Sequence, residues 1–429
     1  MLWAAALMFC AAPTFVAAQA QIGAREQRPG HTHEAELAKD MGALEWPGRE
    51  AIVVREVEVG PWSLHRIGSW ETVGGLPADR DAAAFVAEKG GLEPETIRFE
   101  QAGAIVVRMP AGELLPTAGL AGKPVAACEV LSASRREDGD ADLERTAFVL
   151  YEPRRNDTDN QARGVKEEDS PAGGLVVLLP GMFGTPEPVI DSMVGQLRDR
   201  GWHVLRMLTH SSRFTERAEF VLAPGGGIAD VAAQVAEVLG DRAAECAFAV
   251  EKACEFFAIS RPTLPIDRRV AFGMSGGGMV LPTVVAREPD AYKAAVFVGA
   301  GCDFAAIAMD SNYAEWIDAV RVSWASDPTE ADRTRFTDAY LDAATLDSYH
   351  TALFMRDIPA LMLHGISDRA VPAATGDLLW HRLGKPERWT VPAGHEVLFL
   401  AYLPARAADV LDWMEQATGS SSTSPAPSP

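Results

Sequence analysis

One serine of the chain stands where it could act as a nucleophile. Ser275 lies in Gly-Met-Ser-Gly-Gly, residues 273–277, which fits the pattern G-x-S-x-G. The segment 268–272 before it reads as a strand, and the apolar run 279–286 after it is compatible with a helix. A serine on a sharp turn between strand and helix is strained, and its hydroxyl projects into solvent. The alternative reading of this short pattern is a glycine-rich turn.

A serine hydroxyl is a weak nucleophile near neutral pH, so it needs a base, and the base needs an acid to fix its tautomer. His395 and Asp368 could serve as this base and acid, because each lies in a loop after a predicted strand. Asp303, after the predicted strand 293–301, is the alternative acid, and we prefer Asp368. His364, which precedes a glycine after another strand, is interpreted as structural.

With serine, aspartate and histidine in this order, residues 123–416 resemble the α/β-hydrolase family. The resemblance implies an α/β fold with a mostly parallel eight-stranded sheet, helices on both faces and a helical cap. It implies acyl transfer at the carboxyl ends of the strands, with no cofactor and no metal. It also implies an oxyanion hole made by the backbone amides of Gly276 and Met182, although Pro180-Gly181 stands where many relatives carry His-Gly.

The pattern of the surrounding chain agrees with such a fold. Apolar runs alternate with helix-length segments from residue 175 onward, which predicts βαβ units and a parallel sheet covered on both faces. The segment 304–357 is long for a crossover and rich in aromatic residues, so we expect it to form the cap. Most of its aromatic side chains should pack the cap's own core, and one or two should reach substrate. Those singled out are Tyr313, Trp316, Trp324, Phe336, Tyr340 and Tyr349.

The ends of the chain have other patterns. Residues 1–20 lack charged side chains, have an apolar centre and end in Ala-Gln-Ala, which predicts a signal peptide and a secreted or periplasmic protein. Residues 21–50 read as a linker and 417–429 as a disordered tail. Residues 51–122 read as a small α+β accessory region of strand, helix and strand.

Charge and cysteine content limit the partners. The net charge of -21 disfavours nucleic acid, anionic membranes and polyanionic substrates, and we expect no stable membrane insertion. Cys246 and Cys254 fall in a predicted helix, too far apart to pair with each other. Cys128 and Cys302 are expected to be buried thiols, and no cysteine spacing is typical of a metal site.

These observations favour a secreted serine hydrolase that cleaves carboxylic esters, similar to carboxylesterases or lipases. Its substrate would be a small-molecule, lipid or carbohydrate ester. One alternative is a serine peptidase of the prolyl oligopeptidase kind, which shares the triad and its order. The other is a non-catalytic binding protein on the same fold. The presence of all three triad residues disfavours this alternative.

Overall fold

The computed structural model describes most of the chain beyond residue 120 and three short stretches before it. The described residues are 44, 46–57, 95–99, 104–108, 121–135, 141–154, 173–181, 187–208, 218–313 and 320–419. The elements below belong to one compact unit, Glu45–Pro429. The predicted signal peptide, most of the predicted linker, the helix expected at 78–91 and the tail from residue 420 lie outside the described residues.

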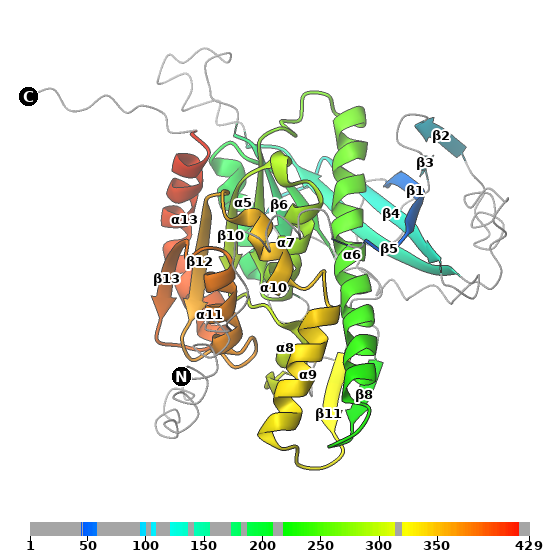
Figure 1. The fold of residues 1–429 in the computed structure, drawn as a ribbon. Helices are drawn as coiled ribbons and strands as arrows, with labels where there is room; N and C mark the ends of the chain where they lie inside the picture. The colour runs from blue at the N-terminus through cyan, green and yellow to red at the C-terminus, as the bar shows by residue number, and fades with distance from the viewer. Residues whose placement is uncertain are drawn as a thin grey trace, which may run out of the picture. The chain divides into compact units, whose positions relative to one another are not determined.

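The centre of the fold is one large mixed sheet (Figure 1). Eight of its strands run in the spatial order β4-β5-β7-β6-β9-β10-β12-β13, and from β7 to β13 all neighbours are parallel. This confirms the predicted mostly parallel sheet. The strands are β4 (Ala126–Arg135), β5 (Ala141–Tyr151), β6 (Leu175–Leu179), β7 (His203–Met207), β9 (Arg269–Met274), β10 (Tyr292–Val298), β12 (Ala360–Gly365) and β13 (Glu387–Val391).

Three further strands extend this sheet beyond the eight that were expected. β1 (Arg49–Val57) pairs antiparallel with β4, β3 (Ala104–Arg108) pairs parallel with β1, and β2 (Glu95–Phe99) completes the edge, which makes eleven strands. The described strands of the accessory region expected at 51–122 therefore share the sheet of the main domain.

The central strands are buried on both faces of the sheet, which explains their continuous apolar runs in the sequence. Val270, Phe272 and Met274 of β9 pack in one core, and Ala271 packs in the core on the other face. Helices cover both faces, so both sides of each strand are buried. α5 (Glu187–Asp199) and α13 (Leu403–Ala417) contribute to the first core. α6 (Ile228–Ser260), α7 (Gly276–Arg287) and α11 (Ala373–Arg382) contribute to the second.

The cap is built from two segments of the chain. The first is the expected insertion between β10 and β12, which contains α8 (Phe304–Asp310), β11 (Val320–Trp324), α9 (Glu330–Ala343), α10 (Ser348–Thr351) and a 3-10 turn (Ala352–Met355). The second was not predicted: β8 (Ala218–Leu222) pairs in parallel with β11, and the first half of α6 packs on α9 (Figure 1). Ile228, Ala232 and Val235 of α6 share a buried cluster with Phe336 and Tyr340 of α9.

The described cysteines agree with the sequence analysis. Cys128, Cys246, Cys254 and Cys302 are all buried. Burial raises the pKa of the Cys254 thiol to about 12, so this thiol stays protonated near neutral pH. Among the described helices, none is both long and apolar enough to cross a membrane.

Candidate active site

The turn that carries Ser275 is strained and tightly packed. Ser275 connects β9 to α7 and has φ 49° and ψ −120°, a conformation that L side chains rarely adopt. Its amide donates to the carbonyl of Val298 at the end of β10 (2.8 Å), and its carbonyl accepts from the Met279 amide (2.9 Å). A Cβ on Gly273 would lie 2.6 Å from the Cα of Gly278, so only glycine fits at position 273.

His395 lies within hydrogen-bond distance of both Ser275 and Asp368, one on each ring nitrogen. Nδ1 of His395 is 2.6 Å from Oδ2 of Asp368, and Nε2 of His395 is 3.0 Å from Oγ of Ser275. A carboxylate can only accept, so Nδ1 donates to Asp368, and Nε2 is left free to accept the serine proton. This order of contacts is the one that a nucleophile, a base and an orienting acid would require.

The Asp368 carboxylate is fixed by its own loop. Oδ1 accepts from the amides of Ala370 and Val371, both at 3.0 Å, while Oδ2 faces His395. Only 2% of the Asp368 side chain and 6% of the His395 side chain are exposed, so their hydrogen bond is shielded from water.

Asp303, the alternative acid, has a different role. It caps the N-terminus of α8: its side chain accepts from the Ala306 amide (3.0 Å), and its backbone has φ 64°. Its own amide and that of Phe304 donate to the buried carboxylate of Asp347, at 2.9 and 2.7 Å. The carboxylate that His395 contacts is that of Asp368.

One of the two expected oxyanion-hole residues can be placed. Gly276 is the first residue of α7 and is buried directly after Ser275, so its amide lies at the N-terminus of a twelve-residue helix. The positive end of the helix dipole favours a developing oxyanion there. Met182 lies outside the described residues, which include Pro180 and Gly181 just before it.

His364 lies outside the triad, as the sequence suggested. Its side chain is tightly packed: a Cβ on Gly376 would lie only 2.7 Å from the His364 ring. Its Nε2 is 3.8 Å from the Asp377 carboxylate. Burial, together with the nearby Arg388 charge, lowers the pKa of His364 from its ordinary 6.5 to about 4. The ring is therefore neutral in the folded protein at neutral pH.

This burial predicts an acid-sensitive contribution to stability. Between pH 6.5 and pH 4 the unfolded chain binds a proton at His364 and the folded chain does not, so stability falls as the pH falls. A shift of this size lowers the free energy of unfolding by about 3 kcal/mol. Urea unfolding at pH 7, 5 and 4 should show a steeper loss for the wild type than for His364→Gln. Parallel curves would contradict the assignment.

The aromatic residues of the cap separate into two groups. Phe336 and Tyr340 are fully buried in the cap's own core, and Trp324 packs edge-on against Phe336. Tyr313 instead lies edge-on to the His395 ring, with ring centroids 6.0 Å apart, and its hydroxyl donates to Glu396. Trp316 lies outside the described residues. Glu396 and its contact with Tyr313 were not predicted, although the position of Glu396 directly after His395 was the available signal.

The strands deliver these groups to one edge of the sheet. Ser275 follows β9, Asp368 lies in the loop after β12, and His395 begins α12 (His395–Val397) after β13. α12 continues through a π-helical turn (Leu398–Tyr402) into α13. The carboxyl ends of parallel strands meet at one edge, which is where ligands bind in open α/β sheets.

Comparison with protein families gives one match. The model of the prolyl oligopeptidase family matches residues 250–421, which contain all three triad residues but make up less than half of the chain. The strand order, the placement of the triad and this match agree with one another. The chain has the α/β-hydrolase fold.

Solved structures similar to this chain include peptidases and an esterase. An acylaminoacyl peptidase of Pyrococcus horikoshii is 11% identical with a TM-score of 0.40, and the match covers 67% of this chain and 48% of that one. A puromycin-hydrolyzing peptidase of Mycobacterium tuberculosis is 13% identical with a TM-score of 0.43, covering 75% and 51%. A Pyrococcus furiosus esterase is 12% identical with a TM-score of 0.39, covering 67% and 90%.

The chain spans about half the length of both peptidase chains. No curated protein matches the sequence. In the part of the chain that the structure describes, no group of three or more histidine, cysteine or acidic side chains could hold a metal ion.

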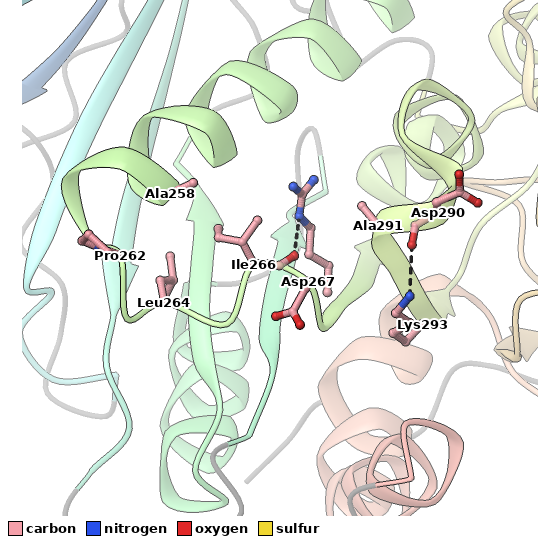
Figure 2. Close-up of a pocket in the computed structure, with 9 residues that line it drawn as sticks. Ala258, Pro262, Leu264, Ile266, Asp267, Asp290, Ala291 and Lys293 are labelled. Atoms are coloured by element: carbon pink, nitrogen blue, oxygen red, sulfur yellow. Dashed lines mark hydrogen bonds between the residues drawn. The ribbon is translucent and has the colours of Figure 1, made fainter. Parts of the chain in front are cut away.

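A separate pocket of about 540 Å³ lies at the opposite edge of the sheet (Figure 2). It is lined by Arg269, the first residue of β9, and by Lys293 near the start of β10, whereas Ser275 follows the other end of β9. Lys293 donates to the carbonyl of Asp290, and Arg269 donates to that of Ile266, so both cations are engaged by the pocket's own backbone. This pocket is not part of the triad site.

Proposed function

We propose that the protein is a serine hydrolase, which cleaves carboxylic esters through an acyl-enzyme on Ser275. The observation that carries the proposal is the hydrogen-bonded series Ser275–His395–Asp368, at 3.0 and 2.6 Å, on a strained strand-to-helix turn. A surface serine in an ordinary glycine turn would have neither the buried imidazole nor the buried carboxylate behind it.

The geometry supports a two-step reaction. Oγ of Ser275 attacks the ester carbonyl carbon, and its proton passes to Nε2 of His395. The Gly276 amide, with Met182 as the proposed second donor, binds the oxyanion while Asp368 stabilises the imidazolium. His395 then gives the proton to the departing alcohol. In the second step His395 takes a proton from water, which attacks the acyl-enzyme, and returns this proton to Oγ of Ser275 as the acid is released.

Peptide or amide hydrolysis is the second candidate. It is favoured by the match to the prolyl oligopeptidase family over residues 250–421. The same groups would act, but His395 would protonate an amine, a poorer leaving group than an alcohol, so esters are the less demanding substrates for this machinery.

The two candidates separate in a single assay series. Purified wild-type protein and Ser275→Ala are compared on p-nitrophenyl esters graded by acyl length and on aminoacyl and dipeptidyl p-nitroanilides. We expect ester hydrolysis that Ser275→Ala abolishes. Amide hydrolysis with little ester turnover would overturn the first proposal in favour of the second, and no turnover of either class would favour a binding protein on this fold.

We also propose that the protein is exported, on the evidence of residues 1–20. Expression of the full chain with cell fractionation tests this. Mature protein that begins near Gln21 in the secreted or periplasmic fraction supports export, and uncleaved protein in the cytoplasm contradicts it.

A further inference from the structure

A short turn of the cap touches both loops that carry the proposed base and acid. This turn, Ser311–Tyr313, follows α8 directly. The Asn312 amide donates to the carbonyl of Arg369 (2.9 Å), and the Ser311 hydroxyl donates to that of Ala370 (2.6 Å). Arg369 and Ala370 are the two residues after Asp368, so the turn is fixed to the acid loop by two hydrogen bonds.

From this anchor, Tyr313 reaches the histidine loop. Its amide donates to the Ser311 hydroxyl oxygen (3.1 Å), which orients the residue relative to the acid loop. Its hydroxyl donates to Oε1 of Glu396, the neighbour of His395, and its ring stands edge-on to the imidazole at 80°. One side chain therefore joins the loop of Asp368 to the loop of His395.

The charge states favour this link near neutral pH. The hydrogen bond from Tyr313 is the main cause that lowers the pKa of Glu396, so the carboxylate stays ionised and accepts. Partial burial, followed by the contact with Glu396, raises the pKa of Tyr313 well above its usual value, so the phenol keeps its proton and donates. A hydrogen bond to an ionised acceptor is stronger than one between neutral groups.

The imidazole has close neighbours on its other sides. A Cβ on Gly299 would lie 3.1 Å from Cε1 of His395, and the Phe399 ring is 4.8 Å away between centroids. Tyr313 closes a third side of this enclosure. Without Tyr313 the ring would have more freedom to leave the orientation that faces Ser275.

We infer that Tyr313 is a positioning residue, which holds the loops of Asp368 and His395 in register and keeps the imidazole facing Ser275. The inference rests on the proposed function. It assigns to the cap a role in organising the triad. Misplacing a catalytic group by a fraction of an ångström is enough to slow the chemical step.

The test measures the rate at which a fluorophosphonate probe inactivates the protein, because this rate reports the reactivity of Ser275 without a known substrate. The variants are Tyr313→Phe, which keeps the ring and removes the hydroxyl, Glu396→Ala, which removes the acceptor, and the double variant. The matched control is Tyr349→Phe, since the Tyr349 ring stacks on Arg382, 4.1 Å away, and not on a triad residue.

We expect each single variant to lower the second-order rate constant about fivefold, and the double variant to show the same loss instead of about 25-fold, because both remove one interaction. The control should react like the wild type. Equal rates for Tyr313→Phe and wild type, or fully additive losses, would overturn the inference. A wild type that does not react at all would instead contradict the proposed function.

A spectroscopic readout separates positioning from a general loss of structure. The proton between Nδ1 of His395 and Asp368 is shielded from water and should give a low-field proton resonance, absent from His395→Gln. In Tyr313→Phe, with unchanged circular dichroism, this resonance should broaden or shift through faster exchange. An identical resonance together with a reduced inactivation rate would mean that Tyr313 contacts the probe and does not position the histidine, which would also overturn the inference.

Discussion

Replacing Asp368 by asparagine is expected to lower ester turnover and probe reactivity by about 10⁴-fold while leaving the fold intact. The asparagine oxygen can still accept from the Ala370 and Val371 amides, as Oδ1 of Asp368 does now. Its NH₂ group would then face Nδ1 of His395 and donate to it. The imidazole proton would move to Nε2, which could no longer accept the proton of Ser275.

Asp303→Asn is the matched control for this change. It makes the same substitution at the other aspartate that follows a strand, and asparagine tolerates both the left-handed backbone and the N-cap position of Asp303. We expect turnover within about threefold of the wild type, because asparagine is nearly as good a cap as aspartate. A large loss in Asp303→Asn with little loss in Asp368→Asn would reverse the assignment of the acid.

Gly277→Ala is expected to destabilise the protein by about 3 kcal/mol, at the upper end for overpacking, and to slow probe reaction more than tenfold. A Cβ at this position would lie 2.2 Å from the carbonyl oxygen of Leu179 and 2.5 Å from that of Pro180. Both are backbone atoms, so no side chain can turn aside. The start of α7 would have to move away from β6, and the Gly276 amide would move with it.

The control for Gly277→Ala is the same substitution at Gly240. This glycine lies within α6, and a Cβ there would meet nothing within 4 Å. Alanine is the better helix former, so the free energy of unfolding should rise by about 0.5–1 kcal/mol. Urea unfolding of both variants measures the contrast. Equal stabilities of Gly277→Ala and wild type would contradict the close packing of α7 on β6.

The nucleophile turn could be predicted because its signal is local. The turn's signal lies within twenty residues: the glycines at 273 and 277, the preceding strand and the following helix. Close contacts of the turn require glycine at both positions. A proline inside the following segment did not end the helix: α7 continues through Pro282, which is buried near its middle.

The edge of the sheet could not be predicted in the same way. The string Ala-Ile-Val-Val-Arg at 51 and at 104 reads as a strand in both places, and the two strands lie side by side with Val53 paired to Ile105. Strand pairing depends on partners far away in the chain, and apolar alternation does not name them. For this reason the sequence predicts the strands of an accessory region but not the pairing of β1 with β4.

The cap shows the same limit. Its insertion after β10 was recognised from length and aromatic content, but the pairing of β8 with β11 joins segments about 100 residues apart. Nor does composition tell Tyr313 from Phe336. Both are aromatic residues of the cap, yet one lies against His395 and the other is buried in the cap core.

The most direct test of the central claim is to locate a fluorophosphonate label by mass spectrometry on the intact protein and its peptides. The reaction joins phosphorus to Oγ of Ser275 and releases fluoride, while His395 takes the hydroxyl proton. We predict one label per chain, on the peptide that contains Ser275, and no label in folded Ser275→Ala or His395→Ala. A folded wild type that stays unlabelled, or a label on another residue, would contradict the assignment of Ser275 as an activated nucleophile.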